Sequence, residues 1–565
     1  MPQQAANSGF RSHKARVGCR TCYCEDHQRE DMTYNVVENG RYHHETIAIR
    51  ERSLGLPQSR MLAYMKDHGL QEAEPAIVKL APTLDLILGR TYDIPHSEWK
   101  GIGRLAHEVL FQAALSAKGI SEYSNSFQWF PTPSSWSRIQ NPSKYFGSWS
   151  LSEHGRALIL TPLILRRYAD TSWFKADFLR RVNDVMRNQD HIPQELGSTD
   201  KITYAFGAIA SAVSIVSVTT GANPDEIERL VIHGRKCFQS LQRCAAKLAE
   251  DDTTPPVVLG KRKRRITKKE NPFLANCGLP NVHIGLHLGE FAREYGTLMN
   301  CNVLAGEAKH KVFKTWADNA SPKNLMSYLF MKERMSQSLR LLVAGGFDGL
   351  DKYVKEALER LHKACPKLFR SLSPQIEQQQ DTLENQTGQI ISLTTQGKIH
   401  LWNSSRLRET GLNIPRHSSV RSDFGLRQQL RQAYAEDYSI ENLVILEDKI
   451  HCFTSIAFDD ESTRSKHRRT LHSGDFIAYG GHYMRVIQFM LHVFNGTKYI
   501  FFSAEVLVPA DNPPKDRDPL LGLPLYKPSG HRVLRGLPRV ALSSEYFVDF
   551  GNGLYMHCTW RVEDH

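Results

Sequence analysis

The two cysteines Cys19 and Cys22 are spaced as in a zinc knuckle. A Cys-x-x-Cys turn offers two thiolates to a tetrahedral zinc ion, and later histidines can complete the site. The pair His43 and His44, in the segment RYHHE, is the predicted second half of this structural zinc site. Free thiols beside exposed histidines are the competing interpretation. Two further residues of this segment are alternative ligands: Cys24 and His27.

The segment from residue 280 to 316 is the densest in ionisable side chains. His283 and His287 are four residues apart and share one face of a predicted helix, a spacing that suits a metal ion. The zinc-protease pattern requires Glu directly after the first histidine, and Ile284 stands there. Taken alone, these residues favour a histidine-rich helix pair packed in a core. The segment also contains Glu290, Glu294, Glu307, Lys309, His310, Lys311 and Lys314.

A basic run, GKRKRRITKK, occupies residues 260–269 beside a pair of prolines. It predicts a nuclear-import signal or a phosphate-binding patch, and a solvated linker is the alternative. The chain has 72 Lys and Arg against 60 Asp and Glu, a net charge of +12 that favours polyanionic partners such as DNA. The same charge would suit an ordinary basic housekeeping protein. The candidate nucleic-acid-binding residues are Lys261, Arg262, Lys263, Arg264, Arg265, Lys309, Lys311 and Lys314.

The pattern along the chain predicts an α+β protein, with a mostly helical first two-thirds and a small C-terminal β-barrel or sandwich. In GIGRLAHEVLFQAAL, apolar residues recur at helical spacing, whereas Asn495-Gly496 between two β-branched and aromatic runs predicts a hairpin. The predicted units are a zinc-knuckle-like segment (1–60), a helical region (61–250), a basic linker (251–273), a second helical region (274–372), a Gln-rich linker (373–389) and a β-rich domain (390–565).

Composition excludes several classes of protein. A hydrophobic content of 41% and a charged content of 23% exclude wholesale disorder, and ten cysteines do not make a disulfide scaffold. The stretch 202–221 is uncharged and long enough to span a bilayer, but it is rich in Ser, Thr, Ala and Gly. We therefore predict a buried helix there and no membrane partner. The N-terminus shows no apolar region of a secretory signal.

Three collinear segments resemble the CACTA (En/Spm-like) DNA transposases, over roughly residues 8–345. The first is GFRSHKARVGCRTC followed by GRYHHETIAIRER. The second is DIPHSEWKGIGRLAHEVLF, where His96 and Glu98 fall at matching places and Pro95 replaces the family's Met. The third is PNVHIGLHLGEFAREYG and the following GEAKHKVFKTWADNASPKNLMSYLF, where Glu307 and Lys314 fall on a Glu and a Lys of the family pattern.

The resemblance implies a fragment of an RNase H-like nuclease with a helical insertion. In such enzymes three carboxylates hold two divalent metals that activate water and stabilise the leaving oxygen. Glu307 is the expected last carboxylate and Glu98 the second candidate. The family's two aspartates precede its Cys-x-x-Cys segment, but here no Asp occurs before Asp26. We therefore expect no cleavage by this chain alone, and Mg²⁺ binding only if the catalytic set is complete.

The expected function is that of a transposon-derived nucleic-acid-binding protein of the nucleus. One alternative is an active Mg²⁺-dependent transposase or nuclease, completed by upstream sequence or by a partner chain. Another is a non-catalytic nuclear protein-interaction protein that uses the C-terminal β domain. DNA is the expected partner, and a second copy of the chain or a full-length transposase is the protein partner that the resemblance suggests.

Overall fold

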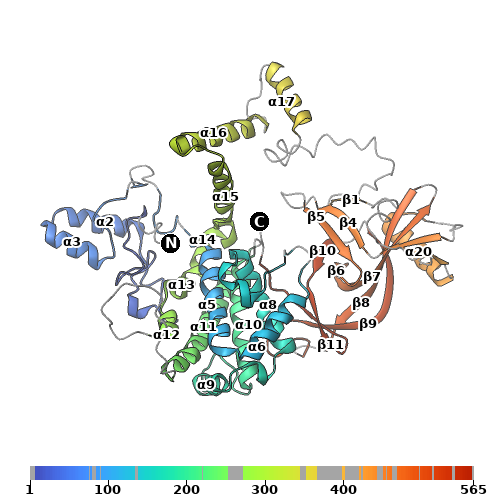
Figure 1. Cartoon of the computed structure of the whole chain (residues 1–565), viewed down its shortest axis with the longest axis horizontal. Coiled ribbons are helices and arrows are strands. Elements are labelled where there is room, and N and C mark those ends of the chain that lie inside the picture. The colour runs from blue at the N-terminus through green and yellow to red at the C-terminus, as the bar shows by residue number, and fades with distance from the viewer. Residues whose placement is uncertain are drawn as a thin grey trace.

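The protein is α+β in the computed structural model, with helices through residue 364 and antiparallel sheet dominating from residue 397 (Figure 1). The predicted class is therefore confirmed. The structure describes residues 7–562 without 76, 79–83, 90, 134–135, 137, 219–220, 252–270, 344–351, 366–396, 401–418, 422–423, 442–448, 454, 461–466, 495–496, 512–514 and 538–540. The basic run Lys261 to Arg265 and the Gln-rich segment 373–389 lie outside these described residues.

The N-terminal segment contains two helices, α2 (His43–Leu54) and α3 (Gln58–Asp67), and the short turn η1 (Asp26–Gln28). It has a small core of its own, made by Phe10, Ile49, Met65, Leu70 and Ile87. Isolated β-bridges join Phe10 to Leu70 and Cys22 to Gly40. These bridges fix the loop that carries the Cys-x-x-Cys motif.

A bundle of buried helices forms the body of the molecule, at the centre of Figure 1. Its elements are η2 (Pro95–Gly103), α5 (Arg104–Glu108), η3 (Val109–Ala114), α6 (Ala117–Trp129), α7 (Pro142–Tyr145), η4 (Phe146–Ser148), α8 (Leu151–Tyr168), η5 (Thr171–Trp173), α9 (Ala176–Met186), α10 (Ser198–Val216) and α11 (Pro224–Asp251). Helix α8 begins with a capping box between Ser150 and Glu153, which satisfies backbone donors at its N-terminus. Most of α8 is buried, so it forms the centre of the bundle.

Helix α10 contains residues 202–216 of the uncharged stretch whose length would suit a membrane span. It packs against α8 and α11, and most of its side chains are buried in the bundle. Its small residues permit this close packing: a Cβ at Gly234 of α11 would lie 2.7 Å from the side chain of Ala212. Among the described helices, none is long and apolar enough to cross a membrane.

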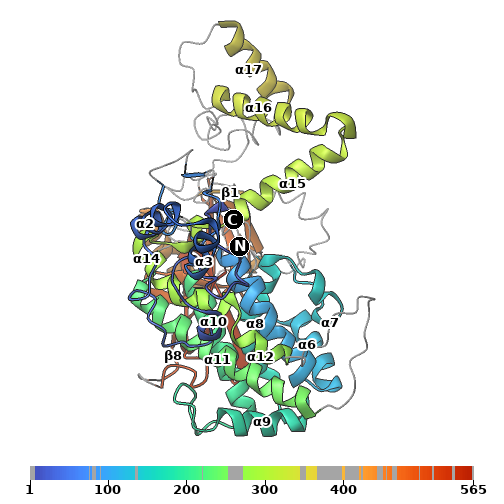
Figure 2. The ribbon, with the colours of Figure 1, turned by 90° about the vertical axis from the view of Figure 1, so that its left-hand side faces the viewer.

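The chain then returns along α11 through four short elements, α12 (Pro272–Cys277), α13 (Pro280–Ile284), η6 (Gly285–His287) and α14 (Leu288–Tyr295). After η7 (Leu298–Cys301) three helices extend away from the body: α15 (Leu304–Asp318), α16 (Leu325–Val343, after η8 at Pro322–Asn324) and α17 (Lys352–Ala364). Figures 1 and 2 show this arm projecting beyond the bundle in both views.

The C-terminal part is a curled antiparallel sheet. Its main path runs β10-β6-β7-β8-β9-β12-β11, with β3 pairing both β2 and β7, and a smaller sheet has the order β1-β4-β5. Strands β7 and β8 form the predicted long hairpin, with Phe494 opposite Thr497. The strands are β1 (Gly397–His400), β2 (Ser419–Arg421), β3 (Lys449–Phe453), β4 (Ser455–Asp460), β5 (His467–His472), β6 (Phe476–Tyr479), β7 (His482–Phe494), β8 (Thr497–Pro509), β9 (Leu525–Gly536), β10 (Ala541–Glu545), β11 (Phe547–Gly551) and β12 (Leu554–His557).

Helix α20 (Phe424–Tyr438) packs on this sheet through Tyr434, whose ring lies against Phe501 of β8. The sheet also contacts the helical body. Arg166 of α8 donates to Asp518 at 2.9 Å, and a Cβ at Gly207 of α10 would lie 2.8 Å from Leu521. The helical and β-rich parts therefore share a packed interface.

Candidate metal centre

Four side chains from two distant parts of the chain converge on one point. Cys19 and Cys22 come from the N-terminal loop, His283 from α13 and His287 from η6. Their ligand atoms all lie within 4.8 Å of one another. Cys22, His283 and His287 are buried, and Cys19 is partly exposed as a residue although its sulfur faces the other three. Among the described residues this is the only such group of His, Cys, Asp or Glu.

The distances within this Cys₂His₂ cluster are close to those between the ligands of a tetrahedral zinc ion. The sulfur of Cys22 lies 3.1 Å from Nε2 of His283, the sulfur of Cys19 lies 3.5 Å from Nε2 of His287, and the two Nε2 atoms are 3.2 Å apart. Zn–S and Zn–N bonds of ordinary length place tetrahedral ligands about 3.3–3.8 Å apart. Since four protein ligands would fill the tetrahedron, the arrangement suits a structural ion rather than one that binds substrate.

The cysteine half of the cluster is held by a buried arginine. Nε of Arg41 donates to the carbonyl oxygens of Cys19 at 3.1 Å and Cys22 at 2.9 Å, which fixes the backbone of the turn. The guanidinium stacks over Tyr23, at 4.2 Å from the ring centre. Its positive charge lies next to two thiols, so it also favours their ionised form.

The histidine half depends on the start of α13. Pro280 occupies the first turn, where its fixed φ favours the helix and its missing N–H costs nothing. The following turn places His283 and His287 on one face, with ring centres 5.1 Å apart. Tyr92 closes the site from a third segment: its hydroxyl lies 2.7 Å from Oγ1 of Thr21 and 3.7 Å from the sulfur of Cys19.

The close approach of thiols and imidazole shifts the pKa values of Cys19, Cys22 and His283 in different directions. Burial alone would raise the pKa of Cys19, but the Cys22 hydrogen bond and the charges of His287 and His283 outweigh it and hold that pKa well below its usual value. Burial would lower the pKa of His283, yet the charge of Cys19 raises it to about 9. Hydrogen bonding to Cys22 lowers the pKa of Cys24 to about 6. Burial and the hydrogen bonds to Cys19 and Cys24 raise the pKa of Cys22, so this thiol would lose its proton when zinc binds.

The predicted ligands His43 and His44 do not belong to this cluster. Both begin α2; His44 is exposed and stacks on Tyr42, while Nδ1 of His43 accepts from the backbone N–H of Leu86 at 3.5 Å. The sequence analysis considered ligands near the cysteines in the sequence, whereas the cluster joins segments far apart in the chain. The spacing of His283 and His287 did signal a metal site, but nothing local linked that pair to cysteines 261 residues away.

The two predicted catalytic carboxylates, Glu98 and Glu307, are not among the four residues of the Cys₂His₂ cluster. Glu98 is completely buried in an ion pair with Arg235, so it is engaged by a cation and is not part of an acidic cluster. Both of its carboxylate oxygens accept from Arg235, and its role as a divalent-metal ligand stays a prediction. Glu307 lies in α15, and its side chain is outside the described residues.

The predicted nucleic-acid-binding residues of α15 are partly described. Lys314 is exposed, and Lys309 is exposed but pairs with Glu333 of α16 at 2.6 Å. The side chain of Lys311 lies outside the described residues, as do residues 261–265 entirely. Two exposed lysines of α15 therefore remain as candidates that the structure places.

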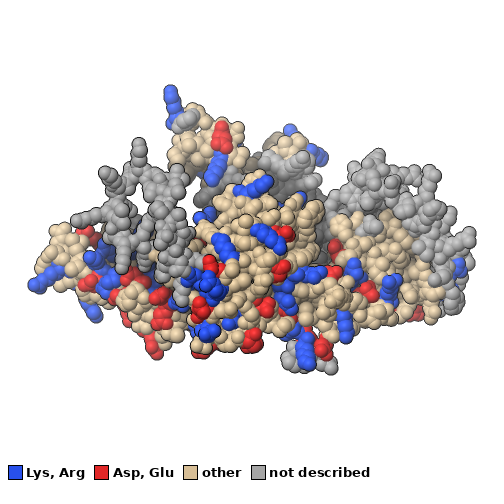
Figure 3. Space-filling view, turned by 60° about the horizontal axis from the view of Figure 1, so that its bottom comes forward, with Lys and Arg blue, Asp and Glu red and all other residues tan. Residues whose placement is uncertain are grey.

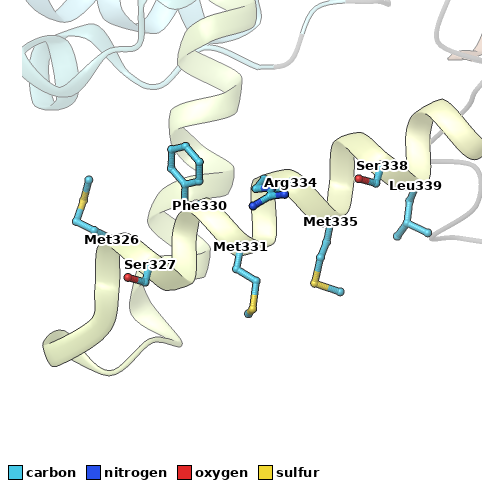
Figure 4. A pocket seen from close by; sticks show the side chains of 8 residues that line it. All are labelled: Met326, Ser327, Phe330, Met331, Arg334, Met335, Ser338 and Leu339. Carbon is cyan, nitrogen blue, oxygen red and sulfur yellow. The ribbon is translucent and has the colours of Figure 1, made fainter.

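An open hollow of 840 Å³ lies along α16. Its lining is apolar and solvent-exposed, and Figure 4 shows Met326, Phe330, Met331 and Met335 projecting from the helix. Arg334 is the one ionisable side chain among the lining residues that the structure describes. The hydroxyl groups of Ser327 and Ser338 are its other polar lining groups.

The Cys₂His₂ cluster is thus the best-defined chemical site in the described part of the chain. In comparisons with known proteins, no family profile, curated protein or solved structure matches this chain.

Proposed function

We propose that this protein is a transposon-derived nucleic-acid-binding protein whose N-terminal segment and helical body are joined by a structural zinc ion. The convergence of Cys19 and Cys22 with His283 and His287 carries the proposal. The cysteines belong to the first of the three segments that resemble CACTA transposases, and the histidines belong to the third. We also propose that the helical part has the fold that the resemblance implies, an RNase H-like remnant with a helical insertion.

The zinc part rests on the donor set. Two thiolates and two imidazoles are the ligands of many structural zinc sites, and the separations of 3.1, 3.5 and 3.2 Å are close to those in a tetrahedron. Because such a site has no open coordination position, its role would be to hold the fold together. The N-terminal loop and α13 would then behave as one unit.

The nucleic-acid part rests on charge. The chain carries a surplus of twelve positive charges. On the face shown in Figure 3, Lys and Arg are interspersed with Asp and Glu, so that face presents no single phosphate-binding patch. Lys309 and Lys314 instead lie on α15, the first helix of the projecting arm, where they are accessible to a long polyanion.

The proposal is limited to binding. Strand cleavage by two divalent metals needs a set of carboxylates, and among the described residues the one group of His, Cys, Asp or Glu close enough to hold a metal is the Cys₂His₂ cluster. Glu98, the one predicted catalytic carboxylate whose side chain is described, is neutralised by Arg235. We therefore expect DNA binding without strand cleavage, and the experiment below scores both.

One titration tests this proposal. The full chain is mixed with labelled duplex DNA and Mg²⁺ over a salt series, and both gel shift and cleavage are scored. We expect salt-sensitive binding to intact DNA. Lys314→Gln should lower the slope of log K against log salt by about 0.9 if this lysine neutralises one phosphate. Lys144→Gln, which removes an exposed charge from α7, is the matched control and should leave the slope unchanged.

Two outcomes would contradict the proposal. No shift at low salt would refute nucleic-acid binding and favour a protein-interaction role. Cleavage that Glu307→Gln abolishes would mean that the chain is a working nuclease with its carboxylates completed elsewhere.

A further inference from the structure

A buried ion pair lies directly behind the histidine half of the metal centre. Nη2 of Arg235, on α11, donates to both carboxylate oxygens of Glu98, on η2, at 2.6 and 2.7 Å. The side chains are 1% and 0% exposed. Withdrawing two charges from water is costly and is often no more stabilising than an apolar pair. This pair therefore calls for a role beyond packing.

Arg235 also holds the backbone that leads into His283. Its Nε donates to the carbonyl oxygen of Val282 at 3.3 Å, and its Nη2 reaches that of Asn281 at 3.4 Å. One guanidinium thus fixes the two residues that immediately precede the first histidine ligand. Its rigid fork of donors suits several acceptors at once, which a lysine could not provide.

Two glycines allow this close approach. A Cβ at Gly285, between the two histidines, would lie 2.8 Å from Nε of Arg235. A Cβ at Gly101 of η2 would lie 2.4 Å from the side chain of Asn281. Both distances are too short for a Cβ atom to be accommodated. The backbones of η2 and of the turn that carries His283 and His287 are therefore in close contact with each other and with Arg235 of α11.

We propose that Arg235 and Glu98 are positioning residues of the metal centre. Arg235 anchors the turn before His283, and Glu98 fixes the guanidinium in the orientation in which Nε donates to the carbonyl of Val282 and Nη2 lies within reach of that of Asn281. The histidines are then held at the separation a tetrahedral ion needs before the ion binds. This inference rests on the zinc centre proposed above, and it gives the buried Glu98 a function other than catalysis.

The test uses Co²⁺ in place of zinc, with the full chain. Tetrahedral Co²⁺ bound to thiolates absorbs visible light, so one titration reports both affinity and ligand geometry. Arg235→Met should weaken Co²⁺ binding by about 10- to 100-fold, the usual effect of losing an outer-shell partner of a metal ligand, and should alter the visible spectrum. Glu98→Gln should also weaken Co²⁺ binding and alter the visible spectrum.

Two further variants separate positioning from folding. Arg166→Met breaks the Arg166–Asp518 pair at the interface with the β-rich part, away from the metal centre, and should leave Co²⁺ affinity unchanged. The double variant Glu98→Met with Arg235→Met leaves no unpaired buried charge, so it should keep the helical fold. It still lacks the donors to Asn281 and Val282, so its Co²⁺ affinity should stay lowered.

The outcomes are distinguishable. If the unaltered chain binds no Co²⁺, the metal centre itself is refuted. If the unaltered chain binds Co²⁺ and the folded double variant binds it equally well with the same spectrum, the zinc centre stands and the positioning role is overturned.

Discussion

Removing the metal, or the ligand Cys22, should strongly destabilise the helical body. Cys22 and His283 are 261 residues apart, so an unfolded chain must close a very long loop, at a large entropic cost, to assemble the four ligands. Zinc would therefore bind only the folded state, apart from weak capture by the local Cys-x-x-Cys pair. At free zinc about 1,000 times the dissociation constant, this linkage contributes about 4 kcal/mol. For a cooperative unit of about 250 residues, that corresponds to roughly 8–16 °C in Tm.

The assay is thermal unfolding followed by helical circular dichroism at several zinc concentrations, with and without a chelator. We expect each tenfold rise in free zinc to add about 1.4 kcal/mol while the site is near saturation. Cys22→Ser should abolish that dependence. Cys365→Ser, the same substitution at an exposed cysteine, is the control and should leave it intact. The metal-linked folding would be refuted if the thermal midpoint stayed the same with chelator, with added zinc and in Cys22→Ser.

Three other predictions follow from single contacts. Burial lowers the pKa of His107 from 6.5 to about 4, so the unfolded chain takes up its proton first as pH falls. The free energy of unfolding should therefore drop between pH 6.5 and 4, with up to about 3 kcal/mol of the loss due to His107. His107→Gln should reduce the pH dependence of urea midpoints across that window, and the remainder should come from His154 and His191, whose pKa values burial also lowers. Gly285→Ala should cost about 1–3 kcal/mol in urea unfolding and weaken Co²⁺ binding, because its Cβ would collide with Arg235; unchanged values would contradict the tight packing. Arg166→Met removes the partner of buried Asp518 and should cost about 1–3 kcal/mol, with faster proteolytic cleavage between the helical and β-rich parts as the measurement.

Local patterns in the sequence predicted the elements well. The helical period after Pro224 corresponds to α11 (Pro224–Asp251), and the uncharged stretch 202–221 overlaps the buried helix α10. The alternation around residues 473–508 corresponds to the β7–β8 hairpin. These features depend on neighbours within a few residues, so a single sequence contains the information needed to find them.

The site was predicted only in halves, because its contacts are long-range. The Cys-x-x-Cys motif and the spacing of His283 and His287 were each visible, but no local pattern joined them. Glu98 shows the same limit. A carboxylate in an apolar helical segment has the same sequence signature whether it binds a cation cofactor or an arginine, and its partner Arg235 is 137 residues away. Only the three-dimensional structure shows that the partner of Glu98 is Arg235.

The segment from Tyr92 to Glu98 connects the metal centre to the projecting arm. Tyr92 contacts Cys19, and Glu98 pairs with Arg235 behind the histidines. Between them, Asp93 accepts the backbone N–H of Val303 at 2.9 Å, directly before α15 begins at Leu304. One short segment thus contacts both halves of the centre and the base of the arm. We therefore expect metal loss to loosen the start of α15, and with it the placement of the lysines proposed to bind nucleic acid.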